Sequence, residues 1–259
     1  MLRELFTYLK TKASKEAKAF GHLYESIAIQ EREKRCKSFW LPHRTKCKNF
    51  ISSHLKLAKA FDRVLILGSG PLHEIPIDIL STTFRDVDLI DIVHLSETKN
   101  KYSHLKNIHF IEADITELEK KILHEKKIIN QVPTFFQNQK YDLIISANLL
   151  TQLSYHLRNF LEKKAVPKLT DVELEKFCYQ VSYDHYQYIT GFQCPVILIT
   201  DIETEFIGIH DELIDKQMPY LNFPLPAPKD SWLWNLAPRP EVSKDYSVRM
   251  KVAAFILNY

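Results

Sequence analysis

Residues 66–77, LILGSGPLHEIP, decide the fold, because an apolar run ends there in two glycines that stand one residue apart. The preceding stretch, RVLIL, is rich in Val, Ile and Leu and predicts a buried strand. Glycine lets the backbone approach a ligand closely, and a helix that begins after it presents unpaired N–H groups. The pattern predicts a loop that holds phosphate or adenosine groups, and an ordinary strand-to-helix turn is the alternative.

Similar short apolar runs recur along the chain. We expect strands at residues 63–68, 87–93, 107–113, 141–147 and 194–200, with helical segments beginning near residues 74, 97, 116, 152 and 170. Two more expected strands, SWLWNLAP and SVRMKVAAFILNY, follow each other without a helix and predict an antiparallel hairpin. The expected fold class is α/β: a doubly wound, mostly parallel, seven-stranded sheet with a C-terminal antiparallel hairpin and a helical N-terminal extension.

The first 60 residues differ from the rest of the chain. They read as helical, and Pro42 is expected to mark a break before an amphipathic helix over residues 44–61. We therefore expect a helical arm at 1–60 and an α/β domain at 61–259. Residues 1–60 carry a net charge of +9, whereas the whole chain carries +3. Such an arm can attract an anionic partner such as nucleic acid or a phosphorylated metabolite, or its lysines can simply solvate helix faces.

Composition excludes some classes of protein. The longest apolar runs are too short to cross a bilayer, and the charged first twenty residues show no secretory signal. We therefore expect no membrane partner. The four cysteines form no CxxC pair, so we expect reduced thiols and a cytoplasmic location.

Two acids follow the next expected strands. Asp91 lies 23 positions after Gly68, close to the spacing of a carboxylate that accepts hydrogen bonds from ribose, and Asp114 follows the third strand. A helix cap or a solvated loop is the alternative for either acid. A dinucleotide fingerprint needs Gly or Ala at position 73, and His73 argues against NAD or FAD there.

These motifs resemble the class I (Rossmann-like) S-adenosylmethionine-dependent methyltransferases, from about residue 61 to the C-terminus. The resemblance implies S-adenosyl-L-methionine as the cofactor. It implies that Asp91 holds the ribose, that Asp114 faces the adenine, and that the segment after the fourth strand lies beside the methyl group. The implied cofactor-binding residues are Gly68, Ser69, Gly70, Leu72, Asp91, Ile92, Asp114, Ile115 and Asn148. Leu72 stands where the family has a third glycine, and Leu67 where many members have an acid.

The acceptor site is marked less clearly than the cofactor site, because methyl transfer mainly requires alignment of the two reactants. His43, Asn148 and Gln152 are the candidates for catalytic or acceptor-binding residues, and helix caps or packing are the alternatives. Acids at 201, 203 and 205 could hold Mg²⁺ but more often decorate a solvated strand edge, so we expect no metal site.

The predicted function is methyl transfer from S-adenosylmethionine to a small-molecule or anionic acceptor. The segment SANLLTQL lacks the Asn/Asp-Pro-Pro-aromatic quartet of enzymes that methylate bases, which disfavours a nucleic acid acceptor. The alternative is a catalytically inactive relative that binds RNA or a protein through its basic arm. An NAD-dependent oxidoreductase is a third interpretation, which His73 disfavours.

Overall fold

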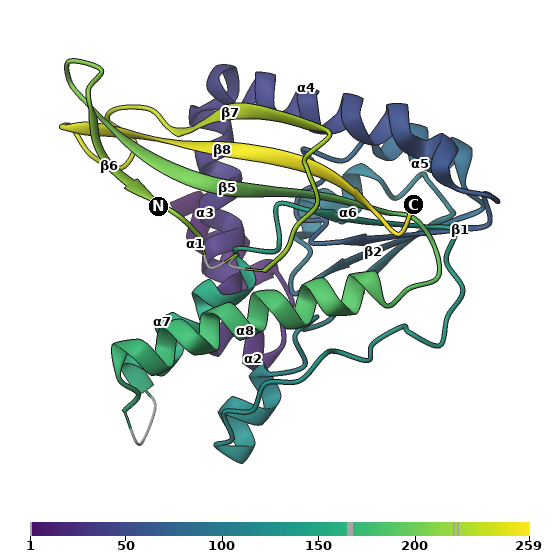
Figure 1. Ribbon diagram of the computed structural model, residues 1–259, viewed down its shortest axis with the longest axis horizontal. Coiled ribbons are helices and arrows are strands. Elements are labelled where there is room, and N and C mark those ends of the chain that lie inside the picture. The colour runs from purple at the N-terminus through teal and green to yellow at the C-terminus, as the bar shows by residue number, and fades with distance from the viewer. Residues whose placement is uncertain (1, 165–167, 220, 222) are drawn as a thin grey trace.

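The computed structural model describes residues 2–164, 168–219, 221 and 223–259, and its centre is one mixed β-sheet (Figure 1). Within these residues the sheet has eight strands, and seven of them follow the order β3-β2-β1-β4-β5-β8-β7. The strands are β1 (Arg63–Leu67), β2 (Asp86–Asp91), β3 (Ile108–Glu112), β4 (Leu143–Ala147), β5 (Val196–Gly208), β6 (Leu213–Gln217), β7 (Asp230–Ala237) and β8 (Tyr246–Leu257).

The predicted fold class is confirmed. Strands β1 to β5 pair in parallel, whereas β8 is antiparallel to both β5 and β7. β4 is buried along its whole length, as its continuous apolar sequence requires for a strand covered on both faces. The eighth strand, β6, was not predicted. It pairs with an extension of β5 that runs through TDIETEF to Gly208. That extension is mostly half-buried and β6 is exposed along its whole length, which suits their polar sequences.

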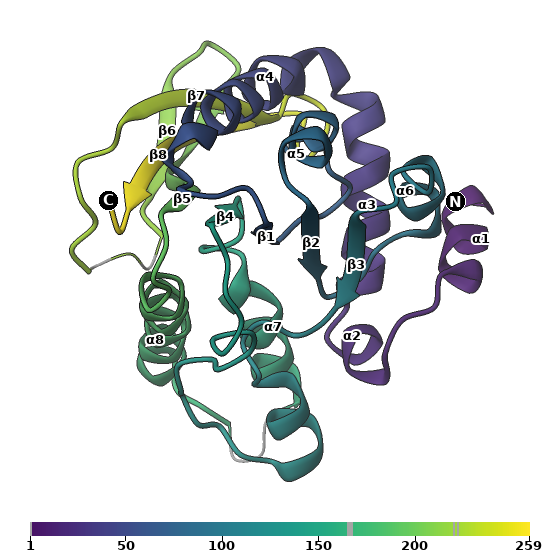
Figure 2. The same cartoon turned by 90° about the vertical axis from the view of Figure 1, so that its right-hand side faces the viewer.

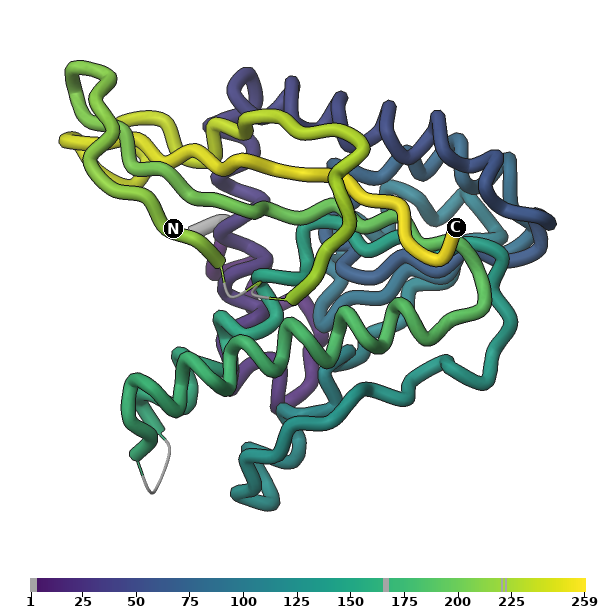
Figure 3. The backbone as a smooth tube through the Cα atoms, viewed as in Figure 1, coloured from purple at the N-terminus to yellow at the C-terminus, as the bar shows by residue number. Residues whose placement is uncertain are grey.

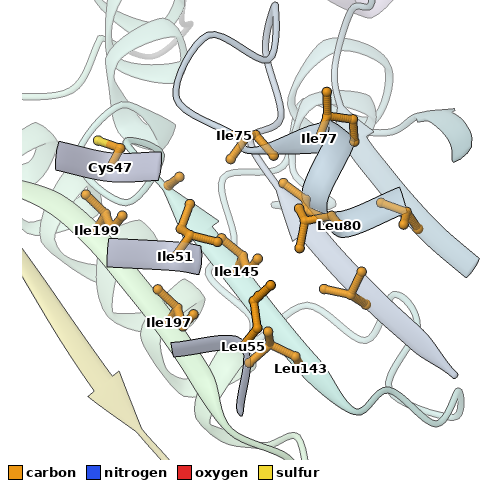
Figure 4. Close-up of a cluster of buried hydrophobic side chains, with 14 of the residues drawn as sticks. Cys47, Ile51, Leu55, Ile75, Ile77, Leu80, Leu143, Ile145, Ile197 and Ile199 are labelled. Carbon is orange, nitrogen blue, oxygen red and sulfur yellow. The ribbon is translucent and has the colours of Figure 1, made fainter. Parts of the chain in front are cut away.

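Helices cover both faces of the sheet, as Figure 2 shows. α4 (Lys37–His54) and α5 (Ile77–Thr83) lie on one face, and α7 (Leu153–Lys164) and α8 (Asp171–Thr190) lie on the other. The core under α4 and α5 joins Ile51 and Leu80 to Ile145 and Ile197 of the central strands (Figure 4). α6 (Ser96–Lys101) follows β2. The helical segment expected to begin near residue 116 is reduced to one short helix, η2 (Lys121–Glu125). No helix in the described ranges is both long and apolar enough to span a bilayer.

The N-terminal segment connects the two helical layers. After α1 (Leu2–Lys10) and α2 (Lys15–Ala19), α3 (His22–Arg35) passes the carboxyl ends of the parallel strands and leads into α4 (Figures 1 and 3). Leu23 and Ile27 of α3 pack against Val93 and Leu95, which follow β2. The helical character predicted for residues 1–60 is therefore confirmed up to η1 (Leu55–Leu57), and α3 covers the sheet edge at which ligands bind in this class of fold.

Pro42 does not break a helix, contrary to the prediction. α4 begins at Lys37 and continues through Pro42. A proline leaves the carbonyl four residues earlier without its usual partner, and here that residue is the exposed Ser38. Water can satisfy the free carbonyl of an exposed residue, so the helix continues. The helix expected near residue 74 also begins later, at Ile77.

Candidate functional site

The glycine loop turns sharply after β1 and stays attached to β2. The backbone N–H groups of Gly68 and Ser69 both donate to the carbonyl of Ile90, at 3.0 and 3.1 Å. Gly68 has φ +72°, and a Cβ there would stand 2.8 Å from the Cβ of Leu149. Gly70 has φ +49°, but a Cβ there would meet nothing within 4 Å. Gly68 is therefore required by packing, whereas Gly70 borders open space.

Asp91 connects the glycine loop to the end of β2. Its Oδ2 accepts a hydrogen bond from the backbone N–H of Gly70 at 2.7 Å, and its Oδ1 accepts one from Ile92 at 2.8 Å. Burial raises the pKa of this carboxyl, and the backbone N–H groups lower it. A carboxylate oxygen has more than one acceptor position, so both oxygens can accept further bonds from a ligand.

Asp114 accepts hydrogen bonds from residues of the loop that follows it. Its Oδ1 accepts hydrogen bonds from the backbone N–H of Thr116 at 2.9 Å and from the Thr116 hydroxyl at 2.6 Å, and its Oδ2 accepts from the backbone N–H of Glu119 at 2.9 Å. This is the capping role that stood as the alternative for this residue. The side chain still borders the ligand cavity, so a contact to a ligand stays a prediction.

A single cavity of about 510 Å³ joins most of the predicted site residues. Its volume lies within the range of about 300–1,000 Å³ typical of small-molecule sites. The predicted residues that line it are Gly68, Ser69, Gly70, Asp91, Ile92, Asp114, Ile115, Asn148 and Gln152. The carboxyl ends of four parallel strands and the helix α3 therefore enclose one common space.

Two predicted site residues do not line this cavity. Leu72 is only 1% exposed and packs in the core beneath α4 and α5. It has φ +63°, a left-handed conformation that a leucine rarely adopts and that glycine would adopt without strain. Only its backbone can lie near a ligand. His43 of α4 is fully buried and stacks on Trp234, with ring centroids 4.0 Å apart and planes 6° apart.

His43 contacts Asn148, which lines the cavity. The indole N–H of Trp232 donates to His43 Nδ1 at 3.0 Å, so the proton of the neutral imidazole lies on Nε2. The contact of 3.2 Å from Nε2 is to the amide nitrogen Nδ2 of Asn148, and turning that amide by 180° places its oxygen there as the matching acceptor. Burial lowers the pKa of His43 to about 3, so the ring is neutral at physiological pH. His43 therefore contacts the cavity lining through Asn148 and does not line the cavity itself.

A second group of titratable side chains in the cavity was not predicted. His22 of α3 forms a short contact through Nε2 with Oε1 of Glu119, and the ring of His156 lies 4.1 Å from that of His22. Burial raises the pKa of Glu119 to about 9 and lowers that of His22, so burial disfavours the charged form of each group. These residues come from three distant parts of the chain, and nothing in the sequence links them.

The charge inside the cavity is mainly acidic. Its lining includes the carboxyl groups of Glu25, Glu74, Asp91, Asp114, Glu119 and Asp201. Arg32 is the one lysine or arginine lining it among the described residues, and its Nε lies 3.5 Å from Glu241. Burial lowers the pKa of both His73 and His156 to about 4. Among the described residues no group of three or more His, Cys, Asp and Glu side chains is arranged to hold a metal ion.

Comparison with known proteins gives similar shapes but no similar sequences. No family model matches the chain. No curated protein matches it either. A phosphoethanolamine N-methyltransferase of Haemonchus contortus in complex with S-adenosylhomocysteine is 16% identical, with a TM-score of 0.32, over 67% of this chain and 33% of that longer chain.

Two further solved structures match over more of their length. A DhpI–SAM–HEP complex is 10% identical, with a TM-score of 0.39, over 93% of this chain and 99% of that one. The 1,6-didemethyltoxoflavin-N1-methyltransferase of Burkholderia thailandensis is 12% identical, with a TM-score of 0.36, over 89% of each chain. At TM-scores below 0.5, none of these similarities bears on the substrate or activity of this chain.

Proposed function

We propose that this protein binds S-adenosyl-L-methionine in the 510 Å³ cavity and transfers its methyl group to a small-molecule acceptor. The observation that carries the proposal is the bond between Gly70 and Asp91, which joins a glycine loop to an acid where two parallel strands end. Open α/β sheets bind nucleotide ligands at this edge, and His73 disfavours a dinucleotide there.

The residues present fit this cofactor. S-adenosylmethionine carries a sulfonium and an ammonium group, and the cavity offers carboxylates with a single, ion-paired arginine among the described lining residues. The open space beside Gly70 leaves room for a ligand against the loop backbone. Asp91 can accept hydrogen bonds from ribose hydroxyls with the acceptor positions that Gly70 and Ile92 leave free.

In this proposal the chain aligns its ligands and excludes water, which are the main requirements of a methyl transfer. When bound, the cofactor supplies an electrophilic methyl group on a positively charged sulfur. Asn148, held by His43 after β4, orients groups in the middle of the cavity. α3 covers the cavity with Glu25, Ser26 and Ile29 and shields it from bulk solvent.

The basic arm is better explained by contacts within the chain than by RNA binding. Arg35 forms a salt bridge with Glu241, Arg44 with Glu33, and Lys46 with Asp230. These pairs use arm cations to attach α3 and α4 to each other and to the segments after β6. A nucleic acid or anionic partner of the arm stays a prediction without a specific contact in its favour.

A thermal-shift comparison tests the proposed function. S-adenosylhomocysteine at 1 mM or so should raise the melting temperature, because a ligand present at about 100 times its Kd stabilises the folded state by about 2.7 kcal/mol. NADH at the same concentration should leave the melting temperature unchanged. A shift with NADH and none with S-adenosylhomocysteine would favour the oxidoreductase interpretation instead.

A further inference from the structure

The cavity has a second end, on the side of β4 away from the glycine loop. The sheet order β1-β4-β5-β8-β7 places β5, β8 and β7 on that side. Asp201 of β5, Met250 of β8, and Trp234 and Leu236 of β7 line the cavity there, together with Trp40 of α4. None of these five residues is among those implied for the cofactor.

Asp201 is the carboxylate of this second end. Its side chain is buried, with the residue only 6% exposed, and the Thr151 hydroxyl donates to its Oδ1. The backbone N–H of Asp201 itself also interacts with the carboxyl, and no lysine, arginine or histidine among the described residues forms a salt bridge with it. Burial also raises the pKa of this carboxyl. A buried carboxylate without a cationic partner is costly unless a ligand supplies the charge or hydrogen bond that is missing.

The neighbouring acids of β5 are used differently. Glu203 pairs with Lys216 at 2.6 Å, and Glu205 pairs with Arg249. The pairing register of β5 with β8 shifts between Asp201 and Glu203. The three acids therefore do not share one solvated edge, as their alternation in the sequence suggested. Asp201 alone lines the cavity.

Two tryptophans, Trp40 and Trp234, line the same cavity as Asp201. The rings of Trp40 and Trp234 meet edge to face, with centroids 5.2 Å apart and planes 79° apart. The Trp40 indole N–H donates to the carbonyl of Leu236 at 2.9 Å, which fixes this corner. Tryptophan rings attract organic cations, and a carboxylate beside them increases the attraction.

We propose that the second end of the cavity binds the methyl acceptor and that this acceptor is an amine, held by Asp201 and covered by Trp40 and Trp234. The inference rests on the proposed function. An anionic acceptor, one of the predicted partners, would meet a carboxylate here and no free cation among the described lining residues. An amine instead supplies the positive charge that no salt bridge among the described residues gives to Asp201.

The same arrangement provides an acceptor, Asp201, for the proton that a bound ammonium must lose before its nitrogen can be methylated. A bound ammonium gives one proton to Asp201 and becomes a neutral amine with a free electron pair. That pair forms the new nitrogen–carbon bond with the methyl of the sulfonium donor, while the carbon–sulfur bond breaks and its electrons stay on sulfur. The product leaves as a methylated ammonium, and the proton on Asp201 returns to solvent.

The experiment measures binding, not turnover. Benzylamine, benzyl alcohol and benzoate are titrated into the protein by calorimetry, with and without saturating S-adenosylhomocysteine. We expect benzylamine to bind at least tenfold more tightly than benzyl alcohol, and benzoate not to bind. Asp201→Asn should weaken the binding of benzylamine at least tenfold, and Thr151→Val should weaken that binding less. Glu203→Gln is the matched control on the same strand and should bind benzylamine as the wild type does.

Equal affinity for benzylamine in the wild type and Asp201→Asn would overturn the inference, as would preferred binding of benzyl alcohol or benzoate. If Asp201→Asn does not fold, Thr151→Val and the series of three ligands decide the question in the same way. S-adenosylhomocysteine binding is measured separately. Its absence would contradict the proposed function, whereas benzylamine binding without it would still support an amine site.

Discussion

The backbone N–H of Gly70 lies 2.7 Å from Oδ2 of Asp91, so the loop after β1 and the acid that ends β2 form one unit. The unit closes one end of the cavity that α3 covers. Its two glycines have different tasks, since Gly68 packs against Leu149 and Gly70 faces open space.

The two glycines should therefore respond differently to alanine. Gly68→Ala combines a left-handed backbone with a contact of 2.8 Å, so we expect a loss of more than about 2 kcal/mol in the free energy of unfolding. Gly70→Ala carries the backbone strain alone and should lose about 1 kcal/mol. Gly70→Ala should also weaken the binding of S-adenosylhomocysteine, because the added methyl group occupies space beside the loop. Urea unfolding measures the loss of stability and a binding titration measures the loss of affinity. Equal losses of stability in the two variants would contradict the prediction.

Glu119 should make the protein less stable as the pH rises. Its pKa is raised from 4.5 to about 9, so between these values the folded state holds a proton that the unfolded state has released. The stabilising contribution of the protonated carboxyl is complete below pH 4.5 and is lost as the pH rises toward 9, at up to about 1.4 kcal/mol per pH unit.

Glu119→Gln tests this pH dependence, because an amide resembles the protonated carboxyl. We expect the variant to lack that loss of stability between pH 6 and 8.5. Glu117→Gln is a nearby control, because the Glu117 carboxyl accepts hydrogen bonds from Gln131 and Thr134 and not from His22, and it should keep the dependence of the wild type. Urea unfolding at four pH values measures it, and parallel curves for the wild type and Glu119→Gln would be the contradicting result.

His185 should have the opposite effect at acid pH. It is buried in α8, its Nε2 lies 3.1 Å from the Ser146 hydroxyl, and burial lowers its pKa from 6.5 to about 3. As the pH falls below 6.5, the unfolded state binds a proton that the folded state excludes, so stability is lost toward pH 3. His185→Gln should reduce this acid slope by about one proton, measured by urea unfolding at pH 7.5, 6.5 and 5.5. An unchanged slope would show that His185 is protonated in the folded state.

The sequence predicted the sheet, and it predicted the residues at the glycine-loop end of the cavity, because those features are local. Continuous apolar runs define β1 and β4, and the spacing of Gly68 and Asp91 reflects a strand, a turn and a second strand. The extension of β5 and the strand β6 were not predicted, since polar strands that are half-buried or exposed have no strong pattern in the sequence. The helix break predicted at Pro42 was wrong, because water can replace the one helical hydrogen bond that proline removes.

The rest of the cavity depends on tertiary packing. His22, Glu119 and His156 meet only because α3 crosses the carboxyl ends of the strands. Asp201 was visible as one of three alternating acids, but only the shift in register after it explains why it alone enters the cavity. His43, a candidate catalytic or acceptor-binding residue in the sequence, lies behind Asn148 and does not line the cavity itself.

Calorimetry with S-adenosylhomocysteine, on the wild type and on Asp91→Asn, tests the central claim most directly. The wild type should bind one molecule per chain. Asp91→Asn should bind at least tenfold more weakly, because a charge-assisted hydrogen bond contributes about 1.5–3 kcal/mol. Asp86→Asn, at the exposed start of the same strand, should bind as the wild type does. A folded wild type that gives no binding heat, or an Asp91→Asn variant that binds equally well, would contradict the account.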